Sequence, residues 1–217
     1  MQAEPARLRI TEIFYSLQGE ADSAGYPTVF VRLTGCPLRC NYCDTAYAFG
    51  GGQWLDVESV MAQVQQLALQ HVCVTGGEPL AQKACLTLLT RLCDAGYRVS
   101  LETSGALPFA EVDRRVVKVV DVKTPGSGEH ERNLYEQLAT LSPHDQLKFV
   151  LCDRADYDWS RQLLARLQRP AECTVWFSPS AEQLPAGQLA DWILEDRLAV
   201  RLQLQLHKVL WGNVAGK

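Results

Sequence analysis

Three cysteines stand close together in the segment TGCPLRCNYCDT at residues 34–45. They are Cys36, Cys40 and Cys43, with the spacing CxxxCxxC, and the next cysteine along the chain is Cys73. Thiolates bind zinc and iron–sulfur clusters tightly, but a closed structural zinc site needs four protein ligands. Three thiolates on a four-iron cluster would leave one iron free to bind a small molecule.

The composition supports a metal or catalytic role for these cysteines. The chain has 217 residues, 47% of them hydrophobic and 21% charged, which suits one domain over residues 1–217. A net charge of −4 argues against nucleic-acid binding. No signal peptide and no run of about 18 apolar residues occurs, so we expect a cytoplasmic protein without a membrane span. Reducing conditions there disfavour disulfides.

Apolar, β-branched runs alternate with segments of helical period. The predicted strands are 28–34, 71–76, 97–103, 116–123, 146–151, 173–179 and 199–207. The predicted helices are 56–70, 80–96, 156–168 and 185–197, with Gly96 as the glycine that ends the second. Such alternation indicates an α/β fold with a mostly parallel sheet. Seven strands are too few for a closed eight-stranded barrel, so we expect a partial, open βα barrel.

In folds of this kind the chemistry gathers at the carboxyl ends of the strands. That rule selects a small set of segments that follow the predicted strands or include their last residues. They are Cys36 with its loop, 76–78, 102–105, 123–128, 178–180 and His207.

Two features beside the cysteine spacing carry a resemblance to a known superfamily. Tyr42 directly precedes the last cysteine, and TGGEP at 75–79 follows the second predicted strand. With CxxxCxxC, these motifs resemble the radical S-adenosylmethionine (SAM) enzymes. The resemblance implies a [4Fe–4S] cluster on Cys36, Cys40 and Cys43, with SAM on the remaining iron, and it also implies a partial barrel.

Further motifs narrow the resemblance over nearly the whole chain. They are FYSLQGE 14–20, GYPTVFVRLTGCPLRCNYCDT 25–45, VTGGEP 74–79, LETSG 101–105, DVKTPGSGE 121–129 and LHK 206–208. Together they resemble the 7-carboxy-7-deazaguanine synthases of queuosine and 7-deazapurine biosynthesis. Members convert 6-carboxy-5,6,7,8-tetrahydropterin to 7-carboxy-7-deazaguanine with loss of ammonia, using a SAM-derived radical and Mg²⁺. The resemblance also implies a homodimer and an external flavodoxin-type reductant.

The resemblance carries residue roles over to matching positions. Thr45 corresponds to the Mg²⁺ ligand. The residues expected to contact SAM are Tyr42, Cys43, Asp44, Gly77, Glu78, Ser104, Lys123, Ser178, Pro179 and Ser180. Those expected to contact the substrate are Leu17, Gln18, Gly19, Glu20, Arg32, Thr75, Glu102 and His207. No protein residue is expected to act as the catalytic group, because the radical derives from SAM.

Chemistry supports several of these roles, although simpler interpretations exist. A carboxylate such as Glu20 or Glu102 is the natural partner of the guanidine-like edge of a pterin, and Arg32 suits its carboxylate. Alternatively, Thr45 is a turn cap, Arg32 a solvent-facing strand residue and His207 a structural histidine. The tail after Lys208 receives no role.

Two other functions stay open at this stage. A glycyl-radical activating enzyme shares the cysteine spacing and a GGEP segment but acts on a protein partner, and the LQGE and HK segments argue against it. A non-catalytic module would hold zinc on the three cysteines and one outside ligand. The other cysteines, Cys73, Cys85, Cys93, Cys152 and Cys173, show no ligand spacing and are expected to be buried.

Overall fold

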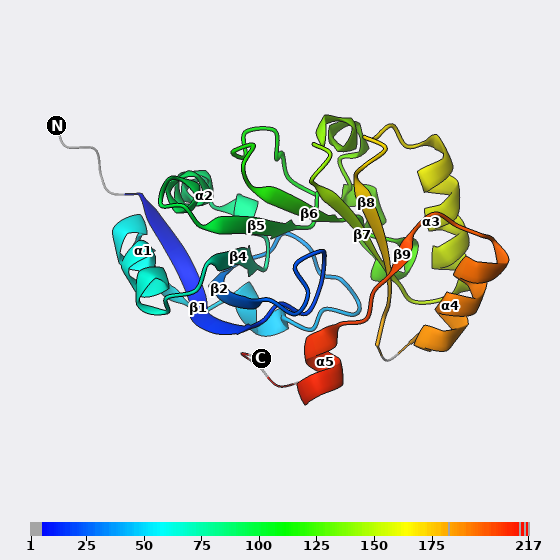
Figure 1. Ribbon diagram of the computed structural model, residues 1–217, viewed down its shortest axis with the longest axis horizontal. Coiled ribbons are helices and arrows are strands. Elements are labelled where there is room, and N and C mark those ends of the chain that lie inside the picture. The colour runs from blue at the N-terminus through cyan, green and yellow to red at the C-terminus, as the bar shows by residue number, and fades with distance from the viewer. Residues whose placement is uncertain (1–5, 182, 213, 215, 217) are drawn as a thin grey trace.

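A single twisted sheet organises the molecule (Figure 1). The computed structural model describes residues 6–181, 183–212, 214 and 216. Within these residues nine strands pair in the order β3-β1-β2-β4-β5-β6-β7-β8-β9. The strands are β1 (Arg7–Leu17), β2 (Pro27–Leu33), β3 (Gln53–Asp56), β4 (His71–Gly76), β5 (Arg98–Thr103), β6 (Val117–Asp121), β7 (Gln146–Leu151), β8 (Thr174–Pro179) and β9 (Arg201–Leu202).

The sheet is parallel from β2 to β9 and antiparallel only at the edge formed by β1 and β3. The end strands β3 and β9 are not neighbours in the strand order, so the barrel is open. This confirms the expected α/β fold with a mostly parallel, partial barrel.

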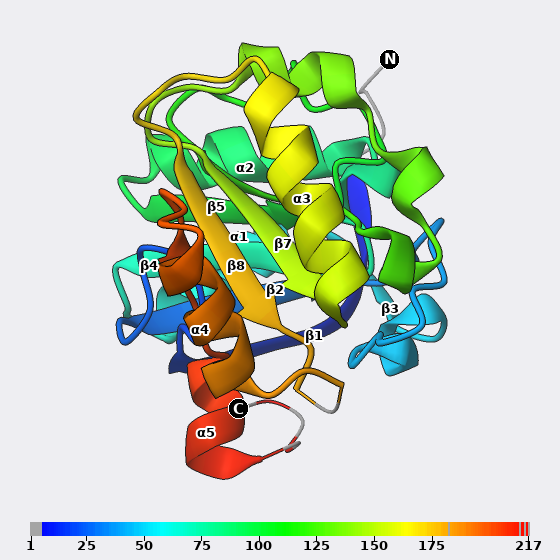
Figure 2. The ribbon, with the colours of Figure 1, turned by 90° about the vertical axis from the view of Figure 1, so that its right-hand side faces the viewer.

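Helices cover the outer face of the curved sheet. They are α1 (Val57–Gln66), α2 (Ala84–Asp94), α3 (Arg154–Arg166) and α4 (Ala186–Glu195). The short α5 (Leu206–Trp211) does not belong to this layer, since His207 and Lys208 line a pocket of the molecule. Short 3₁₀ helices lie at Ala46–Phe49, Pro79–Ala81, Pro125–Ser127, His130–Arg132 and Tyr135–Thr140. Figure 1 shows α1 and α2 beside the β1–β5 end, and Figure 2 shows α3 and α4 over β7 and β8. No helix among the described residues is long and apolar enough to cross a membrane.

Local sequence explains where these helices begin and end. The carboxylates of Asp56 and Asp153 accept hydrogen bonds from the first-turn amides of α1 and α3, at 2.7 and 2.9 Å. Gly96 follows α2 with a φ of +86°, the left-handed conformation that glycine adopts without strain. One continuous core then joins the helices to the sheet, with Leu88, Leu101 and Phe149 fully buried.

The structure corrects the sequence prediction at both edges of the sheet. Strands β1 and β3 were not predicted, because the prediction followed parallel βα units and these strands pair antiparallel. The predicted strand at 199–207 is wrong except for two residues, since β9 contains only Arg201–Leu202. Helix α5 begins at Leu206, so His207 lies in a helix and does not end a strand. Alternating apolar residues form a strand only where a neighbouring strand offers hydrogen bonds, and β9 pairs with β8 over two residues.

Candidate active site

A pocket of about 670 Å³ opens at the carboxyl ends of the parallel strands, as expected for this fold. Among the residues predicted from the sequence, it is lined by Leu17, Gln18, Gly19, Glu20, Arg32, Cys36, Cys40, Tyr42, Cys43, Asp44, Thr45, Thr75, Gly77, Glu102, Ser104, Lys123, Ser180 and His207. Glu78, Ser178 and Pro179 are buried and are not part of the lining.

The loop between β2 and the 3₁₀ helix at Ala46–Phe49 brings the three clustered cysteines to one side of the pocket. A second loop, which follows β6 and includes residues 126–129, holds the cysteine loop in place. The amide of Asn41 donates to the carbonyl of Ser127 at 3.0 Å, and its side chain donates to the carbonyl of Gly126 at 3.2 Å. The amide of Arg39 donates to Glu129 at 2.5 Å. The cysteine loop is therefore anchored through two of its backbone amides and the Asn41 side chain, and none of these three anchoring contacts uses a thiol.

The three clustered cysteines form a donor set that could hold an iron–sulfur cluster. Cys36, Cys40 and Cys43 are free thiols, half-buried, and all three face the pocket. Among the described residues, no three cysteine, histidine or carboxylate side chains converge on one metal position. Thiolates of a four-iron cluster each bind a different iron and lie further apart than the ligands of one ion. Burial raises the pKa of Cys40 to about 11, so a bound metal must displace the thiol proton.

The turn after β4 packs tightly against the cysteine loop. The amide of Glu78 donates to the carbonyl of Gly35 at 2.8 Å. A Cβ atom on Gly77 would lie 2.2 Å from that carbonyl oxygen and 2.8 Å from Cβ of Cys36, so only glycine fits. The Glu78 carboxylate faces away, and accepts hydrogen bonds from the Thr103 hydroxyl and from the amide and hydroxyl of Ser104. Its side chain thus joins the turn to β5.

Polar side chains at the ends of β1, β4 and β5 meet on the opposite wall. Glu102 accepts a hydrogen bond from the Thr75 hydroxyl at 2.9 Å and a longer one, 3.4 Å, from the Gln18 amide. The Gln18 carbonyl oxygen in turn accepts from the amide of Gly19 at 2.9 Å. The structure therefore brings these predicted substrate residues together, and leaves the Glu102 carboxylate facing the pocket.

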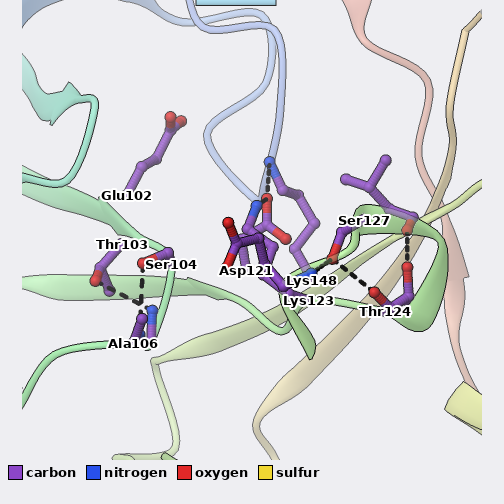
Figure 3. Close-up of polar contacts among 12 residues, drawn as sticks. Glu102, Thr103, Ser104, Ala106, Asp121, Lys123, Thr124, Ser127 and Lys148 are labelled. Carbon is purple, nitrogen blue, oxygen red and sulfur yellow. Dashed lines mark hydrogen bonds and ion pairs between the residues drawn. The ribbon is translucent and has the colours of Figure 1, made fainter. Parts of the chain in front are cut away.

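A buried row of alternating charges crosses the floor of the pocket, where Asp121, Lys123 and Lys148 lie side by side (Figure 3). Lys148 donates to Glu20 at 2.5 Å and lies 3.5 Å from Asp121, which is 3.1 Å from Lys123. Burial raises the pKa of Glu20, but the charge and hydrogen bond of Lys148 outweigh it and lower the pKa overall. The pKa of Lys148 lies well above its usual value, because Glu20 and Asp121 outweigh its burial. The row is therefore fully ionised at neutral pH.

Sequence reasoning missed Lys148 and Asp121, although both line the pocket. Lys148 is a charged residue inside the apolar strand QLKFVL, and a lysine that is only 8% exposed needs a partner. That mismatch was the available signal. For Asp121 the indication comes from the structure alone, where its Oδ1 is buried without a hydrogen-bond partner among the described residues. Such an orphaned acceptor suits a ligand that donates a hydrogen bond.

Helix α5 closes one side of the pocket. The amide of Leu206 donates to the carbonyl of Gly19 at 3.0 Å, and the Gln205 side chain donates to Glu20 at 2.6 Å. The His207 ring packs so closely on Gly19 that a Cβ there would lie 2.2 Å from Nδ1. Lys208 forms an ion pair with Asp44 at 2.8 Å, which ties the helix to the cysteine loop. The tail beyond α5 also reaches the pocket through Gly212, Val214 and Gly216.

Thr45 lies between the cysteine loop and α5. Its hydroxyl donates to the Asp44 carboxylate at 2.8 Å and makes no capping hydrogen bond to the 3₁₀ helix that follows. Lys208 and Thr45 outweigh the partial burial of Asp44 and lower the pKa of its carboxyl to about 2. Two oxygen atoms of the kind that Mg²⁺ prefers therefore stand together at the pocket wall.

Comparison with known sequences agrees with this geometry. Residues 30–122 match the Radical SAM superfamily. A protein of Koribacter versatilis named 7-carboxy-7-deazaguanine synthase is 44% identical, over 94% of this chain and 97% of the relative. One of the same name from Chlorobaculum tepidum is also 44% identical, over 95% of this chain and 96% of that relative.

Solved structures show the same fold. The crystal structure of QueE from Escherichia coli superposes with a TM-score of 0.78, over 93% of this chain and 95% of that one. Its sequence is 24% identical, so this likeness concerns the architecture alone. The two synthase relatives, which match almost from end to end, carry the assignment of the family.

Proposed function

Because this chain belongs to the 7-carboxy-7-deazaguanine synthase family, we propose that its pocket converts 6-carboxy-5,6,7,8-tetrahydropterin to 7-carboxy-7-deazaguanine with loss of ammonia. One observation of the structure carries this proposal. A single pocket is lined by the three half-buried thiols, by the carboxylates of Glu20 and Glu102, and by the guanidinium of Arg32. The thiols suit a radical-generating cluster, and the charged groups suit a carboxylated pterin.

Cys36, Cys40 and Cys43 would hold a [4Fe–4S] cluster, and its fourth iron would hold SAM. When bound, this pair supplies a 5′-deoxyadenosyl radical that removes a hydrogen atom from the substrate. The protein provides position and electrostatics. Contacts to SAM are assigned to the lining residues Tyr42, Cys43, Asp44, Gly77, Ser104, Lys123 and Ser180, and to the buried Glu78, Ser178 and Pro179.

The charged groups orient the pterin. The guanidine-like edge of a pterin donates hydrogen bonds, so Glu20 and Glu102 are its proposed acceptors, with Leu17, Gln18, Gly19, Thr75 and His207 around them. Lys148 keeps Glu20 ionised and thus able to accept. The carboxylate of the substrate pairs with Arg32. Mg²⁺ would bind Thr45 and complete its shell with substrate oxygens and water.

The oligomeric state, the reductant and the cellular location are proposed from the same family resemblance. We propose a homodimer. The exposed apolar side chains of Leu202, Leu204, Val209 and Leu210 support it, because exposed apolar surface gains free energy when a partner buries it. The cysteine loop is half-exposed, which supports reduction by an external flavodoxin-type protein. Eight free cysteines support a reducing, cytoplasmic location.

The test is reconstitution with iron and sulfide without oxygen, followed by SAM, reductant, Mg²⁺ and the tetrahydropterin. Mass spectrometry should detect 7-carboxy-7-deazaguanine only when the pterin is present. Cys40→Ala should abolish the product. Cys93→Ala is the matched control, because Cys93 lies in α2 outside the pocket, and it should retain activity.

Other outcomes identify other functions. SAM cleavage to 5′-deoxyadenosine without a deazaguanine product would discard the substrate and favour an activating enzyme that acts on a protein. A colourless protein that holds stoichiometric zinc and no iron would discard radical chemistry altogether.

A further inference from the structure

Two residues without an assigned role, Glu12 and Tyr47, hold one edge of the Arg32 guanidinium. Its Nε donates to Oε1 of Glu12 at 2.7 Å, and the same oxygen accepts a hydrogen bond from the Tyr47 hydroxyl at 2.8 Å. The Arg32 side chain is 15% exposed, and both Arg32 and Tyr47 line the pocket. Glu12 therefore fixes this edge of the guanidinium from the side away from the pocket centre.

Aromatic rings fix the plane of the same group. The guanidinium carbon of Arg32 lies 5.7 Å from the centre of the Phe14 ring and 5.8 Å from that of Tyr47. Arginine stacks favourably on aromatic faces, so the two rings restrict rotation about the end of the side chain. Phe14 is itself held by stacking on Phe30, with 5.0 Å between ring centres.

A β-bulge in β1 places Glu12 opposite Arg32. The pairing of β1 with β2 begins with Ile10 opposite Leu33 and continues with Glu12 opposite Arg32, so Thr11 is the extra residue. The Thr11 hydroxyl shares a hydrogen bond with the Thr34 hydroxyl at 2.7 Å. Without the bulge, Thr11 would face Arg32 and no carboxylate would reach its Nε. Bulges commonly re-aim a side chain beside an active site.

We propose that Glu12, supported by Tyr47, is the positioning residue that directs the terminal N–H pair of Arg32 towards the carboxylate of the substrate. Guanidinium has five donors in a rigid fork, and Glu12 engages the Nε–H. In the part of the chain that the structure describes, no hydrogen bond occupies the terminal nitrogens of Arg32. A planar fork that is fixed before binding loses little freedom when it pairs with a carboxylate.

The role of Glu12 is geometric and does not depend on its negative charge. Burial lowers the pKa of Arg32, but the hydrogen bond that its Nε donates to Glu12 and the nearby negative charge raise it overall, so the guanidinium stays charged. A negative Glu12 weakens the attraction of Arg32 for a second carboxylate. Glutamine has the same shape and accepts the same hydrogen bonds, so Glu12→Gln separates position from charge.

The test compares two ligands that differ in one group, 6-carboxypterin and unsubstituted pterin, bound to the reconstituted enzyme with SAM. The ratio of their dissociation constants measures the preference for the carboxylate. Glu12→Ala should reduce this ratio about tenfold while the affinity for pterin changes less than about twofold. Glu12→Gln should keep the ratio within about threefold of the wild type, as a conservative rescue.

Controls define what would overturn the inference. Arg32→Met should abolish the preference, and Glu58→Ala, which removes an exposed ion pair with Arg91 on the outer helices, should leave it unchanged. Equal losses for both ligands in Glu12→Ala would show a merely structural role and overturn the inference. So would an unchanged ratio in Glu12→Ala, or a failure of Glu12→Gln to restore it.

The inference rests on the proposed function, in which Arg32 binds the carboxylate, but the two fail differently. A wild-type enzyme that forms product without preferring the carboxylated ligand keeps the proposed reaction and overturns the roles of Arg32 and Glu12. A wild-type enzyme that forms no deazaguanine but loses its carboxylate preference in Glu12→Ala discards the reaction and upholds the positioning role.

Discussion

At the scale of single side chains, the pocket depends on the steric room left by Gly77 and on the charge of Lys148. Gly77 allows the turn after β4 to touch the cysteine loop, because its missing Cβ leaves room for the Gly35 carbonyl. Lys148 lets the carboxylates of Glu20 and Asp121 stay charged in a buried place. Each residue acts on a group that is distant in sequence, and each can be tested by one substitution.

Gly77→Ala should impair the cysteine loop. The new Cβ meets backbone on one side and Cys36 on the other, so the loop must move, at a cost of about 1–3 kcal/mol. We expect a lower iron content after reconstitution and at least a tenfold slower cleavage of SAM. Gly187→Ala is the control, since a Cβ at Gly187 in α4 meets nothing within 4 Å. Equal iron content and rates in both variants would contradict this account of the turn.

Lys148→Met should make ligand binding depend on pH. In the wild type the pKa of Glu20 lies below its usual 4.5, so the carboxylate is ionised throughout the physiological range. Without Lys148, the two largest causes that lower the pKa of Glu20 are lost, so burial should raise this pKa above its wild-type value, opposed only by Gln205 and His207. Affinity for 6-carboxypterin should then fall as the pH decreases from about 8 to 5, while the wild type stays constant.

The same pair contributes to stability with a defined sign. The folded pKa of Glu20 is lowered, so its contribution is present above pH 4.5 and is lost as the pH falls through the folded value.

Lys118→Met is a matched control, because it breaks another buried pair, with Asp145 at 2.8 Å, outside the pocket. Both variants should unfold more easily, by about 3 kcal/mol, yet only Lys148→Met should alter the pH dependence of binding. A pH-independent Lys148→Met would refute the role given to Lys148.

At the scale of elements, α5 joins parts of the pocket that no strand connects. Gly19, Glu20 and Asp44 all contact residues from Gln205 to Lys208, so the helix ties the loop after β1 to the cysteine loop. The helix has few residues and exposes apolar side chains. Its position therefore depends on these polar contacts more than on a core of its own.

Lys208→Met should loosen this connection without unfolding the protein. The ion pair with Asp44 is partly exposed, with Asp44 48% exposed, so its loss should cost less than about 1 kcal/mol of stability. We expect the Michaelis constant for the pterin to rise about two- to fivefold while iron content stays unchanged. Lys83→Met, before α2 on the outer face, is the control. A drop in iron content in Lys208→Met would show that α5 also supports the cluster, against this expectation.

At the scale of the molecule, one sheet and one core serve both halves of the chain. Nine strands pair without interruption among the described residues, and the apolar core extends from Leu8 in β1 to Ile193 in α4. That continuity supports the prediction that residues 1–217 form a single domain. The pocket then spans almost the whole strand order, so its shape depends on the intact sheet.

Phe177→Ala tests that continuity. Phe177 is fully buried in β8 and packs against Phe149 and Tyr157, with ring centres 5.5 and 5.9 Å apart. Its loss should cost about 3–5 kcal/mol. Circular dichroism and tryptophan fluorescence should still follow one urea transition, shifted to lower concentration. Two separate transitions would indicate two domains and contradict the prediction.

The sequence alone was enough to predict the cysteine loop, the turn after β4 and most of the parallel strands. These features are local, because CxxxCxxC brings three thiols together within one loop and each βα unit carries its own periodic pattern. Eighteen of the residues expected from the family resemblance line the pocket. Residues such as Thr75 and Glu102 do so because parallel strands share one carboxyl edge, whereas Leu17 to Glu20 come from the antiparallel β1 and the loop after it, and His207 lies in α5. Their individual roles in binding remain predictions.

Only the tertiary structure decided which distant residues meet. Lys148 is 128 positions from Glu20, and no local pattern connects them. Glu12 faces Arg32 only because a bulge at Thr11 shifts the pairing of two antiparallel strands, one of which was not predicted. His207 lies in a helix because β9 ends early and the chain packs on Gly19. Residue types and local periodicity determine what chemistry and which elements are available, whereas strand pairing and long-range packing determine which charges become neighbours.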